Sequence, residues 1–152
     1  MRFVCELSAT NLTAVMKMKA WFDAVVVFVV LACVAVLAIT AIPFLVGGEI
    51  HGKMLLLHMM SSGALVFALP VLAVTQLMKT LDRSTSGGLR RLSYWATLSL
   101  GFLTIGSVFV CMLPIPSTQQ MVSLVFAHGV VGFLMVPATI LLAISYRLSR
   151  KV

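Results

Sequence analysis

Residues Ala24 to Val46 read AVVVFVVLACVAVLAITAIPFLV, an apolar run without a charged side chain. A run of about 20 apolar residues is long enough to cross the hydrocarbon core of a bilayer as an α-helix, which satisfies its own backbone hydrogen bonds there. A transmembrane β-strand would alternate apolar and polar positions, whereas Val25 to Leu31 is apolar throughout. The stretch therefore predicts a membrane-spanning helix.

Three further runs have the same character and fill most of the remaining chain: Met54 to Met78, Leu92 to Leu113 and Met121 to Tyr146. Of the 152 residues, 61% are apolar and 10% are charged, against roughly 45–50% and about 25% in soluble domains. This composition excludes a water-soluble globule. We predict one all-α membrane domain over residues 1–152, a bundle of four transmembrane helices at about 21–46, 53–78, 92–113 and 120–147.

The basic residues indicate how the chain crosses the membrane. They lie before the first helix, in the second connection and after the fourth helix: Arg2, Lys17, Lys19, Lys79, Arg83, Arg90, Arg91, Arg147, Arg150 and Lys151. Lys53 is the remaining one, in the Gly47 to Lys53 loop. The positive-inside rule then predicts a multi-pass protein of the cell inner membrane with both termini cytoplasmic. Because the basic residues do not form one patch, the net charge of +7 does not indicate nucleic-acid binding.

Residues 1–20 are expected to form a short cytoplasmic segment. Within it, Asn11 to Lys19 fits either an interfacial helix or a mixed polar tail. The first apolar run is about twice as long as the core of a signal peptide, so we expect it to stay in the protein. The three cysteines show no paired spacing and are expected to pack as small apolar side chains: Cys5, Cys33 and Cys111.

Histidines are the only ionisable side chains that we place within the predicted spans, and such groups are costly in a membrane unless they serve a function. His58 lies in the second span and His128 in the fourth, while His51 sits just outside the second. The absence of an acidic residue from the four apolar runs, which we take as the spans, argues against a proton-coupled transporter.

His58 and His128 are expected at one depth. At about 1.5 Å per residue they lie about 31 and 28 Å from the cytoplasmic anchors Lys79 and Arg147. His51 would lie about 42 Å from Lys79, at the outer headgroups. Two histidines at one level on different helices are what a bis-imidazole haem b requires, so we predict that His58 and His128 are iron ligands.

Small residues follow both histidines and would leave space for a macrocycle: Ser61, Ser62, Gly63, Gly129 and Gly132. Two other interpretations stay open. Gly and Ser are the usual residues of close helix packing in membranes, and a Ser61 or Ser62 hydroxyl or a backbone carbonyl would satisfy a lone His58. Pro70 and Pro137 interrupt the two histidine helices and each frees a backbone carbonyl, which would open further space.

His51 precedes His58 by almost two helical turns and would share its helix face about 10 Å above it. There it would contact a haem propionate or border a quinone site, with Lys53 as a cationic partner. Equally, His51, Glu49 and Lys53 fit a plain polar loop. Three histidines also match a zinc set in number, but His51 and His58 are too far apart for one ion unless the helix unwinds at Gly52.

The span pattern and two short motifs resemble the small membrane-bound b-type cytochromes, both the bacterial cytochrome b561 type and the cytochrome b anchor subunits of respiratory oxidoreductases. The motifs are His51-Gly-Lys-Met-Leu-Leu-Leu-His58 and His128-Gly-Val-Val-Gly132. Many such relatives carry two haems, one near each face. This sequence departs from that pattern, because no helix has a histidine in its cytoplasmic half.

One haem near the outer face provides no route across a hydrocarbon core of about 30 Å. We therefore expect electron transfer between membrane quinone and an outer-side redox partner, by one subunit of a larger respiratory complex rather than an enzyme alone. The expected cofactor-binding residues are His58, His128, His51, Lys53, Ser62 and Gly132. The alternatives are a cofactor-free structural or assembly subunit of a membrane complex and a small transporter or channel.

Overall fold

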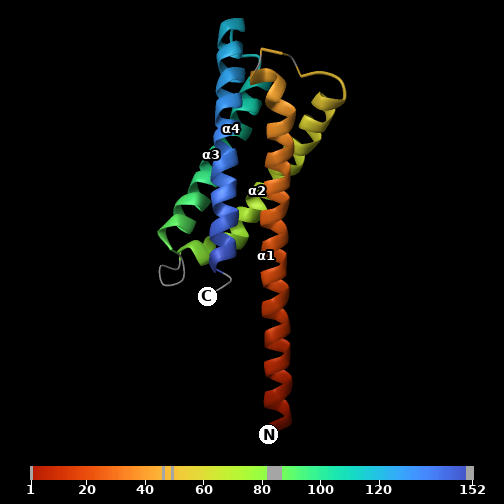
Figure 1. Cartoon of the computed structure of the whole chain (residues 1–152), viewed down its shortest axis with the longest axis vertical. Coiled ribbons are helices and arrows are strands. Elements are labelled where there is room, and N and C mark those ends of the chain that lie inside the picture. Colours follow the sequence, from red (N-terminus) through yellow and green to blue (C-terminus); the bar gives the residue numbers. More distant parts are fainter. Residues whose placement is uncertain (1, 46, 49, 82–86, 150–152) are drawn as a thin grey trace.

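The computed structural model describes residues 2–45, 47–48, 50–81 and 87–149, without the side chains of residues 2–14, 16, 45 and 149. This part of the chain forms four α-helices and no strand (Figure 1): α1 (Arg2–Leu45), α2 (Lys53–Leu81), α3 (Gly88–Met112) and α4 (Thr118–Ser149). Each helix is long and apolar enough to cross a membrane. The predicted all-α fold is therefore confirmed, and so is the prediction of four helices long and apolar enough to span a membrane.

Neighbours in the bundle follow chain order and close into a ring, because α1 also packs against α4. α1 and α3 therefore lie diagonally opposite each other, as do α2 and α4. We call the end with the α1–α2 and α3–α4 connections the histidine end, and the opposite end, towards which α1 begins and α4 finishes, the terminal end (Figure 1).

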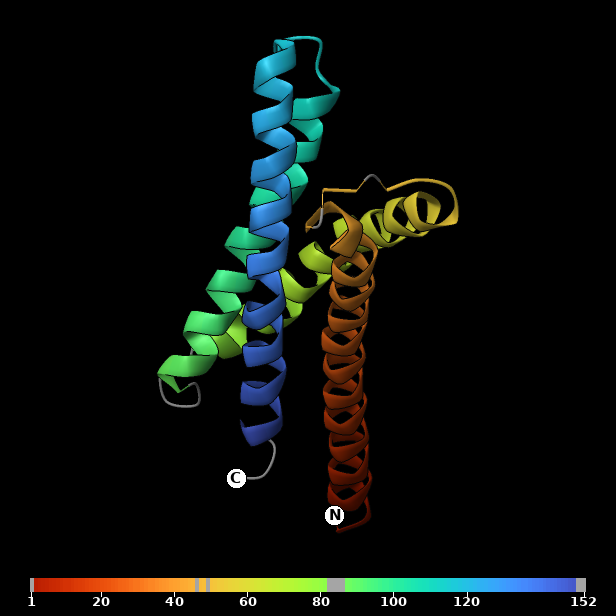
Figure 2. The ribbon, with the colours of Figure 1, turned by 45° about the horizontal axis from the view of Figure 1, so that its top comes forward.

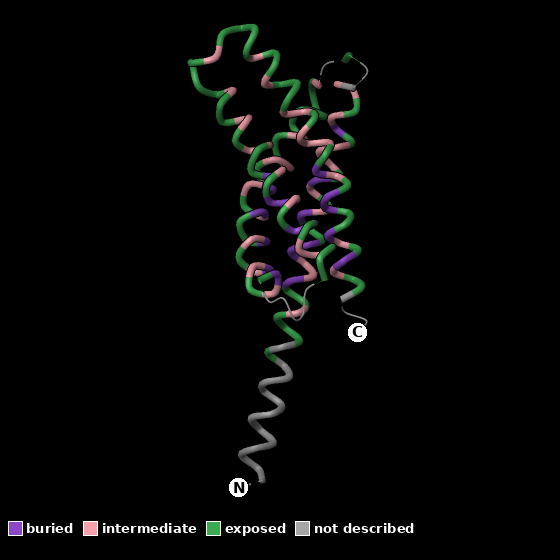
Figure 3. Tube along the Cα trace, turned by 90° about the vertical axis from the view of Figure 1, so that its left-hand side faces the viewer, coloured by how far each residue is buried: buried purple, intermediate pink, exposed green. Residues whose placement is uncertain are grey.

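α1 is longer than the predicted first span. It runs without interruption from Arg2, so residues 2–20 continue the first helix rather than forming a separate segment. Its first turns project past the rest of the bundle (Figure 1), and the buried residues lie within the bundle itself (Figure 3). The apolar part that is long enough to cross a membrane is Lys17–Phe44, which includes Asp23. The statement that the spans contain no acidic residue is therefore wrong for α1.

Local sequence explains where α1 ends and where α4 begins. Gly47 has a φ of 75°, and the amides of Gly47 and Gly48 donate to the carbonyls of Phe44 and Pro43 at 3.3 and 2.9 Å. This is a Schellman motif, in which glycine occupies the left-handed position. α4 begins with reciprocal bonds between Ser117 and Gln120, a capping box.

α2 and α3 pack against each other least of the neighbouring pairs, and α3 and α4 the most. Two hydrogen bonds join α2 to α3 in the terminal half: Arg90 donates to Gln76 at 3.1 Å, and the Tyr94 hydroxyl donates to the Ala73 carbonyl at 2.7 Å. Towards the histidine end the two helices diverge (Figure 2). The bundle is therefore tight at the terminal end and spread at the histidine end.

An ion pair between a buried carboxylate and a partly exposed lysine ties α1 to α2 near the terminal end. Asp23 is 1% exposed and pairs with Lys79, whose side chain is 36% exposed. Nearby, the Tyr146 hydroxyl of α4 donates to the Ala20 carbonyl of α1 at 3.1 Å. These polar contacts between helices sit where the bundle is tightest, and they fix how α1 packs against α2 and α4.

Candidate cofactor site between two histidines

A cavity of about 450 Å³ lies in the histidine half of the bundle, and all four helices contribute to it. Both intramembrane histidines line it, His58 from α2 and His128 from α4. The remaining lining is mostly apolar: Val34, Leu37, Ala38, Ala41, Met59, Ser62, Gly63, Leu65, Val66, Thr104, Ile105, Val108, Phe109, Met112, Gly129, Gly132, Phe133 and Met135. Because α2 and α4 are diagonal partners, the two imidazoles approach the cavity from opposite helices.

His58 is held from α1. Its Nδ1 lies 2.8 Å from the Thr40 hydroxyl oxygen. That hydroxyl donates its own hydrogen to the carbonyls of Val36 and Leu37, at 2.9 and 3.0 Å. With its hydrogen on one of these carbonyls the hydroxyl accepts from His58, and on this basis we assign the proton of His58 to Nδ1. Thr40 is 1% exposed, which makes this bond part of the interior.

His128 is held from α3 in the same way. Its Nδ1 lies 2.9 Å from the Ser107 hydroxyl oxygen and 3.1 Å from the Thr104 carbonyl oxygen. A carbonyl only accepts, and the Ser107 hydroxyl donates to the same Thr104 carbonyl at 2.7 Å. The proton of His128 is therefore also on Nδ1, and this ring has two acceptors where His58 has one.

These bonds leave the second ring nitrogen of each histidine unprotonated. Neither Nε2 atom takes part in a hydrogen bond with any residue that the structure describes. A neutral imidazole whose Nδ1–H is bound to an acceptor presents a lone pair on Nε2, which is the form that ligates a metal. His58 and His128, which both line the cavity, therefore each keep one ring nitrogen that can bind a metal.

Glycines provide space in the cavity. A Cβ added at Gly63 or Gly132, both of which line it, would meet no atom within 4 Å. Gly129 differs, because a Cβ there would lie 2.9 Å from the Phe44 ring of α1. Gly132 and Gly63 thus keep volume open, whereas Gly129 lets α1 approach α4 beside His128.

The cavity ends where the bundle becomes tight. At Gly101 a Cβ would approach Leu69 Cδ2 to 2.7 Å and the Met135 terminal methyl to 3.2 Å, so these helices meet closely there. Leu69 and Met135 are almost fully buried. This layer separates the histidine cavity from the polar contacts at the terminal end.

Pro70 and Pro137 lie on the two histidine helices. A proline has no amide hydrogen to donate to the carbonyl four residues earlier, which here belongs to Val66 in α2 and Phe133 in α4. Both of these residues line the cavity. The two prolines therefore weaken the backbone of the diagonal helices at the cavity wall.

The structure separates the predicted site residues into two groups. His58, His128, Ser62 and Gly132 line the cavity, whereas His51 and Lys53 are exposed and do not. α2 begins at Lys53, and Gly52 before it has a φ of 61°. His51 therefore precedes the helix, and the argument that it shares a helix face with His58 does not apply.

One detail of the sequence interpretation needs correction. The hydrogen-bond partner of His58 is Thr40 of α1, and neither Ser61 nor Ser62 provides it. The Ser62 hydroxyl donates to the Met59 carbonyl of its own helix at 2.8 Å. As for zinc, no group of three histidine, cysteine or acidic side chains in the described residues is placed to hold a metal ion. A bis-imidazole haem needs only two protein ligands.

Thr40, Thr104 and Ser107 are the residues that the sequence interpretation missed. Each is a hydroxyl residue in an apolar run, and such residues usually bond to their own helix backbone, as Thr75 and Thr139 do. Thr40 lies in α1, and Thr104 and Ser107 in α3. A hydroxyl within about one turn of histidine depth on a different helix is the signal that would have identified Thr40 and Ser107. Thr104 contacts His128 through its backbone carbonyl, which the residue type does not reveal.

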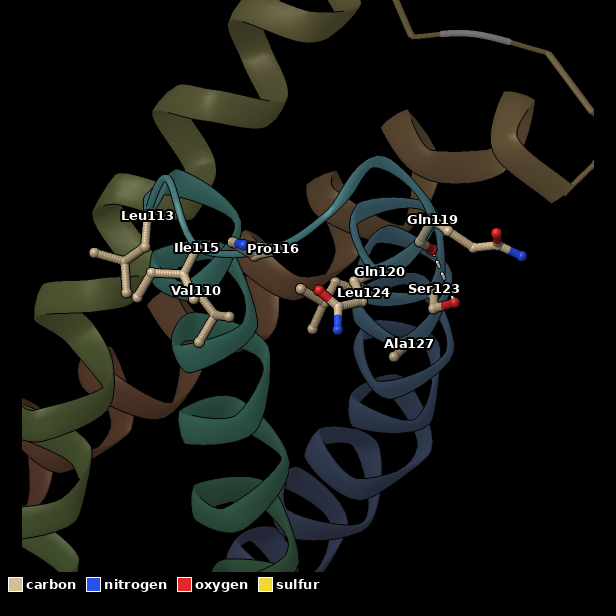
Figure 4. A pocket seen from close by; sticks show the side chains of 9 residues that line it. All are labelled: Val110, Leu113, Ile115, Pro116, Gln119, Gln120, Ser123, Leu124 and Ala127. Carbon is tan, nitrogen blue, oxygen red and sulfur yellow. Dashed lines mark hydrogen bonds between the residues drawn. The ribbon is translucent and has the colours of Figure 1, made fainter.

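A second, more open pocket of about 770 Å³ lies at the end of the α3–α4 hairpin. It is lined by Val110 from α3, by Leu113, Ile115 and Pro116 from the connection, and by the first turns of α4 (Figure 4). None of its lining residues lines the histidine cavity.

Comparison with protein-family models, with curated proteins and with solved structures finds no match for this chain. The fold and the histidine cavity are therefore the basis on which a function is argued.

Proposed function

We propose that this chain is a membrane-embedded b-type cytochrome subunit that holds one haem b between His58 and His128. The observation that carries the proposal is that His58 and His128, on diagonal helices, both line one cavity of about 450 Å³. Ligand sites in proteins are typically cavities of about 300–1,000 Å³ with apolar walls and few polar groups. No charged side chain is among the described residues that line this one.

The residues that line the cavity are of the types that a haem requires. His58 and His128 would provide the two axial nitrogens, with Thr40 on one side and Ser107 with Thr104 on the other setting the ring orientation and raising ligand basicity. Gly63 and Gly132 leave room beside their histidines, and Met135 and Phe133 provide soft, apolar contacts. A bound haem would supply reversible one-electron transfer.

Lys53 and His51 are proposed to act at the rim. Both are exposed at the histidine end, near the beginning of α2. A haem carries two anionic propionates, which would be unstable in contact with the uncharged cavity wall. A cationic or hydrogen-bonding side chain outside the cavity is the natural partner for them.

The proposed orientation has both termini in the cytoplasm of the cell and the histidine end on the outer side of the inner membrane. It rests on the basic residues at the terminal end, such as Lys79, Arg90, Arg91 and Arg147. The haem would then exchange electrons between membrane quinone and an outer-side redox protein, within a respiratory complex that contains other subunits.

A visible spectrum and a pyridine haemochrome assay on the purified chain or its complex test the proposal. We expect about one haem b per chain with a low-spin spectrum. His58→Ala and His128→Ala should each lose the haem, whereas His51→Ala should keep it with an altered midpoint potential. Because an alanine variant can fail to fold, His58→Gly with added imidazole is the matching rescue experiment.

The contrary results are equally specific. A folded wild-type chain without haem would leave a structural or assembly subunit as the better interpretation. Loss of haem in His51→Ala together with full haem in His58→Ala would contradict the assignment of the two ligands.

A further inference from the structure

The histidine cavity is closed on three sides. α1 packs against α2 and against α4, and α3 packs most extensively against α4. The fourth side lies between α2 and α3, which contact each other at Leu69 and Gly101 and farther towards the terminal end. Beyond that point, towards the histidine end, the two helices diverge (Figure 2).

Exposure of the lining residues locates the opening. Of the residues that line the cavity, the exposed ones come from these two helices alone: Met59 and Gly63 from α2, and Phe109 and Met112 from α3. Met59 is 58% exposed, Phe109 59% and Met112 71%. The lining residues of α1 and α4 are buried or half-buried. The cavity therefore opens sideways, between α2 and α3.

What passes through this opening has to be uncharged and lipid-soluble. All four helices are long and apolar enough to cross a membrane, and α2 and α3 also expose apolar side chains outside the cavity lining, with Phe67 78% and Phe102 52% exposed. A charged molecule would lose its hydration on entry without gaining a partner, because no described lining residue carries a charge. A phenylalanine ring and two methionine sulfurs form instead a polarisable surface on which a flat ring packs well.

We infer that the α2–α3 opening is a lateral entrance from the bilayer, and that Met59, Gly63, Phe109 and Met112 form a contact site there for a ring molecule of the quinone class. The inference rests on the proposed function, which requires a lipid-soluble electron carrier beside the cofactor. It adds where that carrier approaches and which side chains touch it.

Photolabelling tests the site directly. The full-length protein, with whatever haem it binds, is placed in lipid vesicles with an azido-benzoquinone that carries a decyl chain, and adducts are mapped by mass spectrometry. We expect adducts on Met59, Phe109 or Met112 that excess unlabelled decyl-benzoquinone displaces. Phe126 of α4, which is 62% exposed and does not line the cavity, is the internal comparison and should carry only label that is not displaced.

A matched pair of variants tests the entrance. Met59→Trp enlarges an exposed side chain at the opening, and Val122→Trp enlarges an exposed side chain of α4 outside the cavity lining, where Val122 is 68% exposed. We expect Met59→Trp to lose displaceable labelling at Phe109 and Met112 and Val122→Trp to retain it, with equal haem content.

Several results would overturn the inference. Labelling that is equal at Phe126, or that the unlabelled quinone does not displace, would mean that lipid chains fill the opening. Cross-links from Phe109 or Met112 to a second chain would mean that protein covers it. A wild-type chain without haem would contradict the proposed function alone, because displaceable labelling at the opening would still support a lateral entrance.

Discussion

His58 Nδ1 lies 2.8 Å from the hydroxyl oxygen of Thr40, so a residue of α1 orients the histidine of α2. The bond crosses between helices, and the Thr40 hydroxyl is itself bonded to the Val36 carbonyl. His128 is orientated by α3 through two acceptors. The orientation of each imidazole is thus determined by a helix that does not carry it, α1 for His58 and α3 for His128. This arrangement can be tested.

Thr40→Val should weaken haem binding by about 10- to 100-fold, the usual effect of removing a hydrogen bond behind a metal-ligating histidine. Valine keeps the shape and removes the acceptor, so His58 becomes less basic and the midpoint potential should rise. Haem titration and potentiometry measure both effects. Thr40→Ser retains the hydroxyl and should behave like the wild type; an equal loss in Thr40→Ser would show that the threonine acts through packing.

Ser107→Ala should have a smaller effect than Thr40→Val. His128 would keep the Thr104 carbonyl as an acceptor at 3.1 Å, whereas His58 would have none left. The same titration compares the two variants. A larger loss in Ser107→Ala would mean that the carbonyl bond does not hold the ring by itself.

Gly132→Leu should abolish haem binding without unfolding the chain. An added Cβ at Gly132 meets nothing within 4 Å, so the new side chain would occupy the cavity rather than push helices apart. Gly106→Leu is the control, because Gly106 is exposed and outside the cavity lining. Haem content and circular dichroism separate the outcomes, and haem retained in Gly132→Leu would place the cofactor elsewhere.

Asp23→Ala should lower the stability of the bundle by about 1–3 kcal/mol, which is below the usual cost of breaking a fully buried ion pair because Lys79 is partly exposed. Unfolding in mild detergent provides the measurement. The haem spectrum of the folded variant should not change, since the layer of Leu69, Gly101 and Met135 separates this ion pair from the cavity. A shifted spectrum would show that the two ends of the bundle are coupled.

Ser117→Cys should react with a membrane-impermeant maleimide on intact spheroplasts, and Gly87→Cys only after permeabilisation. Both positions are exposed and lie at opposite ends of the bundle. The native cysteines are first replaced by serine. The reverse pattern would place the histidine end, and with it the proposed haem, on the cytoplasmic side.

Much of this fold follows from hydropathy along the chain. Four apolar runs of sufficient length have to be helices in lipid, because no other single-segment structure satisfies its backbone there. Helix geometry then places His58 and His128 at similar depths, and both prove to line one cavity. The same extrapolation fails for His51, because Gly52 adopts a positive φ and α2 begins only at Lys53.

The rotation of each helix about its own axis is what the sequence does not reveal. A helix that is apolar on every side carries no polar face from which to infer which residues point inwards. Thr40 and Ser107 are therefore indistinguishable in sequence from hydroxyls that bond only to their own helix, and Asp23 looks like part of a solvated flank. Only the packed bundle pairs them with His58, His128 and Lys79.

The position of the lateral opening could not be predicted from the sequence for the same reason. Spans and depths depend on the free energy of transferring each segment into lipid, which is a sum over local sequence. Which helices become diagonal partners, and where α2 leaves α3, depend on contacts between residues far apart in the chain, such as Leu69 with Gly101 and Gly129 with Phe44. Local transfer energies determine the helices, and tertiary packing determines the cavity and the side on which it opens.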